Sequence, residues 1–484
     1  MKILVLASNA RGYRAFFSGI ALDLKNQFGH DVIMAMENNF SDFLGEENFF
    51  NGETFFAQEY LNQNNIRPSV PDDFPFENLA GTTLVDIDRI EEFRTYDRST
   101  RDMLEKLPRS YLDFFWQLFI SEKFEAVVFE NVSSTFGHVA YLVAQFLKIP
   151  FLGVTASRLP GRSEIYDSLC GPKQDLRAKF VDMEMTELTS NETQYINEYF
   201  SNILQVQPDY MKGNELLAES PFWSRYFSVA KVRVAIGILR FLPNHSRTDL
   251  TFVQTGSPLR FAHAMVNRAI KRKLKLRMIA KYFDDAPSSR YFLYPVHFHP
   301  ESATSVLAPD YINEYEVIRR LASLLPSNTL LFVKDHRSAA GFPDLDFYRR
   351  VSRVPNVRLI HYNQNTKNLI KGSLAIVTLT STVGHEAIIL GKPVILLGDV
   401  YYKFFPGCHL LKRISDFGKV AQEIADRSMK NESFPYSDKI SILRYIATYL
   451  RFTFPAVISL NGKRPEIGFA IAIDEFLSGK MASD

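Results

Sequence analysis

The feature that most constrains this chain is a repeated alternation of short apolar runs with helical segments. Apolar runs at residues 2–7, 31–36, 124–130 and 150–155 are separated by helical patterns, and a second series follows between residues 291 and 397. Runs of this length, apolar at nearly every position, are typical of parallel strands buried on both faces. Such sheets present their chemistry at the carboxyl ends of the strands, where polar residues follow each run here.

The chain has 484 residues, which is too long for one ordinary core and predicts two or three domains. We expect an α/β protein of GT-B-like architecture, with two Rossmann-like domains facing a cleft, a helical insert and C-terminal helices. The expected divisions are residues 1–172 for an N-terminal acceptor domain, 173–284 for a helical bridge, 285–440 for a nucleotide-sugar-binding domain, and 441–484 for helices that pack back on the N-terminal domain. Residues 38–107 are expected to be irregular, with loops and helices inserted above the sheet, and the chain is expected to be helical after Ser415.

Composition argues against several classes of protein. The net charge of +2 gives no general argument for nucleic-acid binding. The two cysteines, Cys170 and Cys408, lie far apart and have neither a disulfide framework nor metal-ligand spacing, so we expect no metal and a cytoplasmic location. The first apolar run is too short for a signal peptide, and no apolar window reaches the ~18 residues of a membrane span. The first loop lacks Gly-x-Gly-x-x-Gly, so no dinucleotide site is predicted there.

Small hydroxyl residues follow the run at residues 374–378 and lead directly into a helix. Thr380, Ser381, Thr382 and Gly384 would place hydroxyls and backbone N–H groups around an anion such as a phosphate. Glu386, in the first helical turns, would accept the hydroxyls of a ribose. The alternative is ordinary N-capping by a serine or threonine.

Histidines and cations end two neighbouring runs. His297, His299 and Glu301 follow one run and suit pyrophosphate binding or proton transfer, with His297 as the catalytic candidate. Lys334, His336 and Arg337 follow the next and suit a dianionic leaving group. The alternatives are satisfied loop histidines and a solvated charged turn.

The N-terminal half offers a carboxylate and several anion-binding side chains at its own strand ends. Glu130 could act as a base or nucleophile in glycosyl transfer, with Asp31, Asp86 and Asp88 as competitors. The candidates for binding an anionic acceptor are Ser8, Asn9, Arg11, Arg158 and Arg162. The alternative for each is an ordinary loop residue.

A basic run at Lys271–Arg277 lies on a helix expected near residues 260–283. Val266, Ile270, Leu274 and Met278 form an apolar stripe on that helix. Contact with an anionic membrane surface is one interpretation, and a solvated polar face is the other. No recognisable nucleic-acid-binding module accompanies the run, so no nucleic-acid partner is expected.

Four segments together resemble the bacterial capsule polysaccharide biosynthesis proteins, a group that includes Kdo transferases. They are residues 291–309 (Tyr-Phe-Leu-Tyr-Pro-Val-His-Phe-His-Pro-Glu-Ser-Ala-Thr-Ser-Val-Leu-Ala-Pro), 333–336 (Val-Lys-Asp-His), 380–387 (Thr-Ser-Thr-Val-Gly-His-Glu-Ala) and 391–395 (Gly-Lys-Pro-Val-Ile). The usual Lys-Glu-His-Pro of the family is Lys-Asp-His-Arg here. The family's Glu-Asp-Gly segment has no clear match, and Glu130 is a loose positional analogue of its aspartate.

This resemblance implies a metal-independent glycosyltransferase that uses a nucleotide-activated sugar, CMP-Kdo or a UDP-sugar, and needs no other cofactor. Its acceptor would be lipid- or glycan-linked, in capsule or surface polysaccharide synthesis. It further implies phosphate contacts for Lys334, His336 and residues 380–382, a ribose contact for Glu386, and a cleft lined by His297 and Glu301. The alternatives are a nucleotide-sugar epimerase or hydrolase of the same fold, and a non-catalytic polysaccharide assembly or binding protein.

Overall fold

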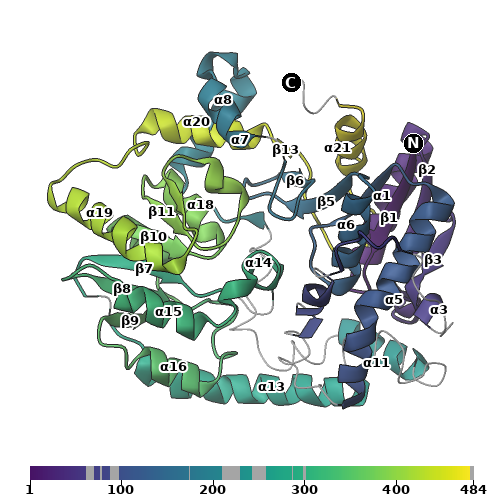
Figure 1. Ribbon diagram of the computed structural model, residues 1–484, viewed down its shortest axis with the longest axis horizontal. Coiled ribbons are helices and arrows are strands. Elements are labelled where there is room, and N and C mark those ends of the chain that lie inside the picture. The colour runs from purple at the N-terminus through teal and green to yellow at the C-terminus, as the bar shows by residue number, and fades with distance from the viewer. Residues whose placement is uncertain are drawn as a thin grey trace.

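Two parallel-rich α/β sheets, side by side, form the framework of the protein (Figure 1). The predicted α/β fold class, with two Rossmann-like units, is confirmed. The computed structural model describes residues 1–61, 70–76, 79–84, 86–87, 98–173, 175–209, 229–241, 258–285, 287–297 and 301–479. His299 and Asp88 lie outside these described residues.

The N-terminal sheet has the strand order β13-β6-β5-β4-β1-β2-β3. Its strands are β1 (Lys2–Ala7), β2 (Asp31–Met36), β3 (Thr54–Phe56), β4 (Ala126–Glu130), β5 (Phe151–Ala156), β6 (Ser163–Tyr166) and β13 (Thr453–Phe454). Strands β1 to β5 are parallel, whereas β6 pairs antiparallel with both β5 and β13. Residues Ile3–Ala7 are fully buried, as expected for a central strand covered on both faces.

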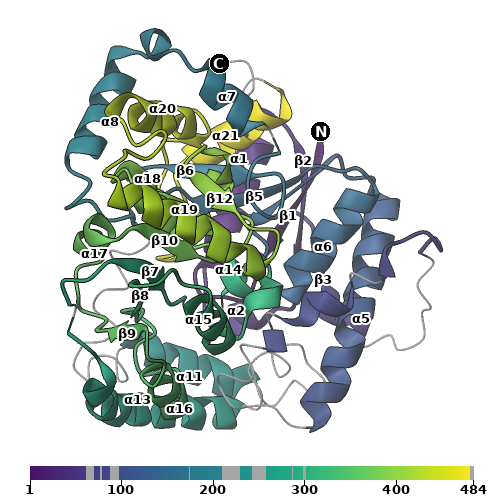
Figure 2. The same ribbon diagram turned by 60° about the vertical axis from the view of Figure 1, so that its left-hand side comes forward.

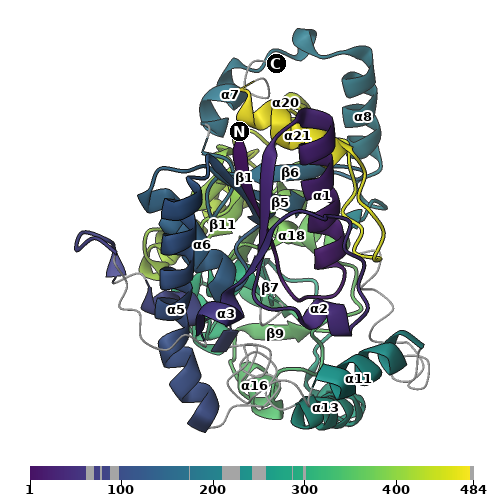
Figure 3. The ribbon, with the colours of Figure 1, turned by 90° about the vertical axis from the view of Figure 1, so that its right-hand side faces the viewer.

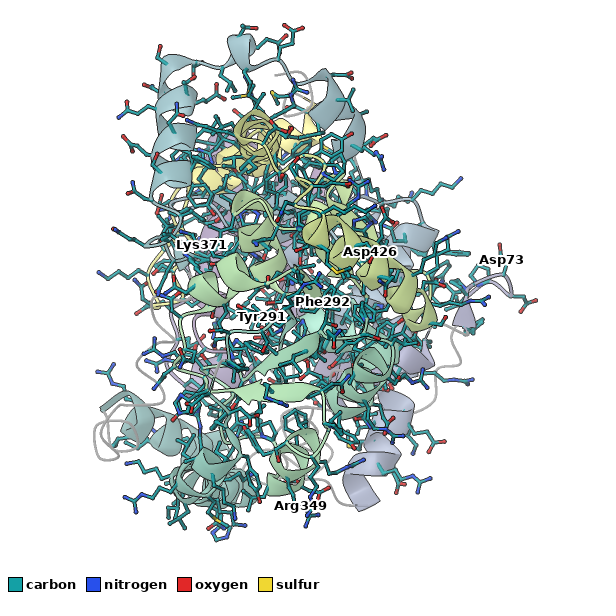
Figure 4. All side chains as sticks on the ribbon, turned by 90° about the vertical axis from the view of Figure 1, so that its left-hand side faces the viewer. Asp73, Tyr291, Phe292, Arg349, Lys371 and Asp426 are labelled. Carbon is teal, nitrogen blue, oxygen red and sulfur yellow. The ribbon has the colours of Figure 1, made fainter. Side chains whose placement is uncertain are left out.

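The C-terminal sheet is parallel throughout, in the order β12-β11-β10-β7-β8-β9. Its strands are β7 (Tyr291–Pro295), β8 (Leu330–Lys334), β9 (Val357–Ile360), β10 (Ala375–Thr378), β11 (Val394–Leu396) and β12 (Cys408–Leu410). Successive residues of β7 serve opposite faces: Tyr291 stacks on Phe332 in one core cluster, and Phe292 joins another with Phe417 (Figure 4).

Helices cover both sheets (Figures 2 and 3). On the N-terminal unit these are α1 (Tyr13–Phe28), α5 (Arg98–Glu122), α6 (Thr135–Phe146) and α21 (Gly468–Leu477). On the C-terminal unit they are α15 (Glu314–Ser323), α16 (Leu345–Val351), α17 (Thr366–Gly372), α18 (Thr382–Ile389), α19 (Phe417–Met429) and α20 (Lys439–Leu450), with α7 (Leu176–Asp182) and α8 (Ser190–Ser201) beside α20. The last helix returns to the first, since Phe469 packs edge-on against Phe16, 4.9 Å between ring centroids.

Several short elements differ from the sequence-based expectation. The chain after Ser415 is not helical throughout, because β13 adds an edge strand to the N-terminal sheet. In the described part of residues 38–107, the expected helices are present as α2 (Phe40–Phe43), α3 (Ala57–Leu61) and the start of α5 at Arg98, whereas β3 is a strand that was not predicted. Edge strands of two to four residues are too short to show a periodic pattern, which explains why they were not predicted.

Candidate functional site

The first turn of α18 follows β10 at the carboxyl edge of the C-terminal sheet. Ser381 is the N-cap, and its Oγ accepts a hydrogen bond from the N–H of Val383 at 3.3 Å. The Ser381 N–H donates to Oγ1 of Thr378 at 3.0 Å. The capping alternative is therefore correct for Ser381, and an anion would meet a turn that is already held in shape.

Gly384 is required by a protein contact. A Cβ at this position would collide with the hydroxyl of Tyr402, which donates to the carbonyl of Ser381 at 2.5 Å. The close approach inferred from this glycine is thus made by Tyr402, a residue of the same half, which further fixes the turn before α18.

His297 braces the same turn from β7. It is 5% exposed, and its Nδ1 lies 2.9 Å from Oε1 of Glu314, which also accepts the His297 N–H at 3.0 Å. Its Nε2 accepts the N–H of Thr380 at 3.4 Å. A carboxylate at Nδ1 selects the tautomer with its proton there, so Nε2 is the acceptor. Both ring nitrogens are engaged, which argues for a positioning role in place of the predicted catalytic one.

Glu301 lies at the start of α14 (Ser302–Ser305), and its carbonyl accepts hydrogen bonds from the N–H and Oγ1 of Thr304. Its side chain is exposed. Helix α14 lies between the two halves in Figure 1, and the neighbouring Val306 packs against the N-terminal core. The segment after β7 therefore reaches the other half.

Lys334 ends β8 and is 6% exposed. Its Nζ donates to the carbonyls of Tyr362 at 3.1 Å and Asp335 at 3.2 Å. Burial lowers the pKa of Lys334 to about 8, and the nearby Arg337 lowers it further while Asp335 and Glu386 oppose the shift. The structure thus holds a buried ammonium beside α18 that keeps most of its charge at pH 7.

After Lys334, Asp335 is buried and His336 is half-buried. Burial raises the pKa of Asp335 to about 7, although Tyr348 donates to its carboxylate at 3.2 Å. Burial, with a smaller effect of Lys334, lowers the pKa of His336 to about 4, so this imidazole is neutral near pH 7. The solvated-turn alternative is wrong for both residues.

Glu386 lies between two lysines. Its carboxylate is 3.6 Å from Nζ of Lys367, and Lys334 also acts on it electrostatically. Burial raises the pKa of Glu386, and the two lysines oppose that shift. Lys367 was not predicted as a site residue: its Nζ also donates to the carbonyls of Ile203 and Val206, which are remote in sequence.

His385, the neighbour of Glu386, is enclosed by tyrosines. Its Nε2 is 3.1 Å from the hydroxyl of Tyr199, and its Nδ1 is 2.6 Å from that of Tyr445 and 3.1 Å from that of Tyr401. Burial lowers its pKa to about 3. Part of the abundant aromatic content therefore builds the junction of α18 with α8 and α20.

Glu130 ends β4 at the carboxyl edge of the N-terminal sheet. It is half-buried, and its Oε1 accepts a hydrogen bond from Oγ of Ser133 at 2.8 Å. Of two competing carboxylates, Asp31 begins β2 at the opposite edge. Asp86 lies at the start of α6, near the edge that carries Glu130, but its carboxylate accepts the N–H of Thr135 at 3.0 Å. Glu130 is thus better placed for a catalytic role than Asp31 or Asp86.

The predicted acceptor residues fall into two groups. Ser8 and Asn9 follow β1; Ser8 is buried, and the Asn9 amide donates to Asn38 at 2.7 Å, while Arg11 is exposed. This first group lies at the same sheet edge as Glu130.

The contacts of Arg158 and Arg162 are structural, which argues against the acceptor role predicted for them. Arg162 donates to Oγ1 and the carbonyl of Thr453, both at 2.6 Å, and so joins β6 to β13. Arg158 donates to the carbonyl of Ala156 and lies 4.0 Å from the buried Glu164. Burial raises the pKa of Glu164 to about 7, with Arg158 opposing the shift.

A short sequence pattern occurs once in each half of the protein. Residues 133–138 (Ser-Ser-Thr-Phe-Gly-His) resemble residues 380–385 (Thr-Ser-Thr-Val-Gly-His), and each opens the helix after a buried strand. Ser134 caps α6 through the N–H of Gly137, as Ser381 caps α18. The equivalent of Thr382 is Thr135, whose N–H binds the Asp86 carboxylate. The repetition is visible in the sequence and supports the choice of Thr382 as a candidate.

The comparison with known proteins supports the description of the C-terminal half of the protein. Residues 252–436 match the family described as "Capsule polysaccharide biosynthesis protein". The resemblance drawn from the sequence is confirmed for this segment. It contains β7 to β12, α18 and Lys334, which we refer to together as the capsule-synthesis segment.

Protein FixF of Sinorhizobium fredii is 32% identical over 169 residues, which are 34% of this chain and 37% of that protein. The match thus spans little more than a third of this relative. The UDP-GlcNAc 2-epimerase of Neisseria meningitidis is similar at 12% identity, over 99% of this chain and 100% of that one, with a TM-score of 0.24. The KpsC β-Kdo 2,7 transferase of Thermosulfurimonas dismutans is similar at 11% identity, over 82% and 97%, with a TM-score of 0.32. Sequence identities and TM-scores this low do not allow the activity of these proteins to be assigned to this chain.

Within the described part of the chain, no three His, Cys, Asp or Glu side chains come together as a metal site. None of the described helices has the length and apolar character needed to cross a membrane.

Proposed function

We propose that the protein is a glycosyltransferase that moves a sugar from a nucleotide-activated donor to a lipid- or glycan-linked acceptor in surface polysaccharide synthesis, at the cytoplasmic face of the membrane. Residues 285–440 would bind the donor and residues 1–172 the acceptor. The family match of the capsule-synthesis segment supports the biological setting, and the site geometry supports the chemistry.

The observation that best supports the donor site is the anion contact at the start of α6, whose local sequence resembles that at the start of α18. In α6, the N–H of Thr135 already binds an anion, the Asp86 carboxylate, at 3.0 Å. The same turn before α18 would offer the N–H and hydroxyl of Thr382, with the Thr380 hydroxyl beside them, to a donor phosphate. Lys334 and His336 follow β8, two places along the sheet from β10, and the lysine supplies the positive charge that a phosphate needs.

The base and sugar of the nucleotide would extend from that phosphate. Glu386 is the candidate for the ribose hydroxyls, and its two lysine neighbours oppose the rise in its pKa that burial causes. CMP-Kdo and UDP-sugars are the donors implied by the sequence resemblance. No metal is required in this scheme, because Lys334 and the α18 N-terminus together stabilise the charge on the leaving phosphate.

In the reaction, the bond between the anomeric carbon and the phosphate oxygen breaks, and a bond forms between that carbon and an acceptor oxygen. The acceptor hydroxyl loses its proton in the same process. Glu130 is the candidate that accepts this proton, because a half-buried carboxylate at a strand end can face a substrate hydroxyl.

The donor site is tested by a thermal-shift screen against CMP, UDP and GDP, using Ser381→Ala/Thr382→Ala and a matched control, Ser134→Ala. Each serine replacement removes an N-cap, which costs about 1 kcal/mol of stability. Only the α18 variant should also lose the nucleotide-dependent shift, because only α18 is proposed to bind phosphate.

Equal nucleotide shifts in all three proteins would contradict the phosphate site. Absence of any nucleotide shift in the wild type would favour the polysaccharide assembly alternative. Release of a free or epimerised sugar without transfer to an acceptor would favour the hydrolase or epimerase alternative.

A further inference from the structure

Helix α13 (Pro258–Ile279) exposes the side that an amphipathic helix normally buries. The apolar stripe is about half exposed, at 45% for Val266, 46% for Ile270, 56% for Leu274 and 50% for Met278. The opposite side faces the C-terminal half through a buried arginine: Arg272 is 6% exposed and donates to the carbonyls of Ala340 and Ser338. The helix is therefore anchored by Arg272 together with Leu276 and the fully buried Ile279, and it presents a second row of apolar residues outward.

Helix α11 (Val229–Phe241) has the same arrangement on the N-terminal half. Its exposed apolar residues are Val232 at 50%, Ile236 at 44% and Leu239 at 61%. Phe241 is buried between Phe40 and Phe43 of α2, with ring centroids 4.9 and 5.2 Å away. Gly237 lies so close to the Phe43 carbonyl that a Cβ would collide with it. Positions 237 and 241 lie across the helix from the exposed stripe.

The two helices lie near each other at one end of the molecule. They are at the bottom in Figure 1 and remain neighbours in Figures 2 and 3. We call the exposed sides of α11 and α13 the basal surface. It spans both halves, because α11 packs on the N-terminal half and α13 on the C-terminal half.

The charge on the basal surface is of one sign. Neither helix contains an aspartate or a glutamate. Exposed cations accompany the apolar residues, namely Arg233, Arg240, Lys271, Lys273 and Arg277. A purely solvated face would not carry seven half-exposed aliphatic and methionine side chains, and two copies of so basic a face would repel each other.

We propose that the basal surface docks on an anionic lipid bilayer, with the apolar stripes of α11 and α13 inserted among the acyl chains and the cations at the phosphate level. Apolar residues combined with flanking lysines and arginines are the composition of helices that lie in a membrane interface. The proposal differs from simple adsorption by Lys271–Arg277, because Arg272 and Lys275 are engaged by the carbonyls of residues 338–343. It deepens the proposed function, on whose membrane setting it rests, by naming the surface that meets the bilayer.

The test is co-sedimentation of the full chain with vesicles of phosphatidylcholine alone or mixed with phosphatidylglycerol. An apolar variant, Leu239→Ser/Ile270→Ser/Leu274→Ser, should lose most binding to the anionic vesicles at low and high salt. A charge variant, Lys273→Gln/Arg277→Gln, should bind roughly fivefold more weakly per residue at low salt only. The matched control, Ile440→Ser, removes an apolar side chain that is 66% exposed elsewhere, and should bind as the wild type does.

Wild-type binding in the apolar variant, or no binding of the wild type to anionic vesicles, would overturn the proposal. So would self-association of the wild type that the apolar variant abolishes, because it would identify a second copy as the partner. Nucleotide thermal shifts on the same samples separate this outcome from a failure of the donor site.

Discussion

The pH dependence of nucleotide binding follows directly from the environment of Lys334. Its pKa is lowered to about 8, chiefly by burial, so the ammonium loses its charge within an accessible pH range. With that value, the side chain is roughly nine-tenths protonated at pH 7 and roughly one-tenth protonated at pH 9. If only the charged form binds the phosphate, affinity falls about tenfold between these pH values, or about 1.4 kcal/mol.

Calorimetry with CMP and UDP between pH 7 and pH 9 measures this change. The ligand adds little to the slope, because a phosphate with a second pKa of about 6 is already ionised at pH 7. Lys334→Met should bind about 10- to 100-fold more weakly at pH 7 and show no such slope, since it lacks the charge-assisted hydrogen bond. Lys334→Arg should keep its charge and bind equally at both pH values.

Lys371→Met is the matched control, because Lys371 is an exposed lysine of the same half (Figure 4). It should keep both the affinity and the slope of the wild type. A wild-type affinity that is constant from pH 7 to pH 9, or an unchanged slope in Lys334→Met, would refute the role of Lys334 in phosphate binding.

Two further substitutions test the chemistry and the core. Glu130→Gln should lower turnover on the order of 100-fold and leave the nucleotide thermal shift intact. The control is Asp31→Asn, at the opposite edge of the sheet. Turnover of Glu130→Gln within about twofold of wild type would exclude Glu130 as the group that accepts the proton. His385 has a folded pKa of about 3, below its ordinary value of about 6.5, so the unfolded chain gains its proton first and stability falls as pH drops below 6.5. Between pH 7 and pH 5, His385→Gln should therefore lose about 2 kcal/mol less than the wild type in urea unfolding; equal losses would show that His385 is not held neutral.

Much of the framework could be predicted because buried parallel strands leave an unmistakable pattern. The bounds of β1, β2 and β9 agree with the sequence-based prediction, since each is an apolar run that ends at polar residues. Short edge strands such as β6 and β13 leave no such pattern, because their pairing partners are remote in sequence.

The candidate site was predictable only in part, for a related reason. Residue type and strand position placed Lys334 and Ser381 at one sheet edge, but no local pattern shows which polar groups become buried. The contacts that reassign His297 come from Glu314 and Thr380, and those that reassign Arg162 come from Thr453. A polar side chain at a strand end can thus be engaged in structural contacts or remain available to a ligand. Only the tertiary contacts distinguish these two outcomes.

The repeated helix start also explains why only one half suits a phosphate. Both α6 and α18 begin with a capped turn, so both present a positive helix end. In the N-terminal half that end is already filled by the Asp86 carboxylate, and the strand before it ends in Glu130, so a phosphate would meet two negative charges. Before α18, β8, which lies two places along the sheet from β10, supplies Lys334, a cation that would attract a phosphate. The same local structure therefore favours the proposed anionic donor in the C-terminal half. In the N-terminal half it leaves the Glu130 carboxylate to act on the acceptor in the proposed reaction.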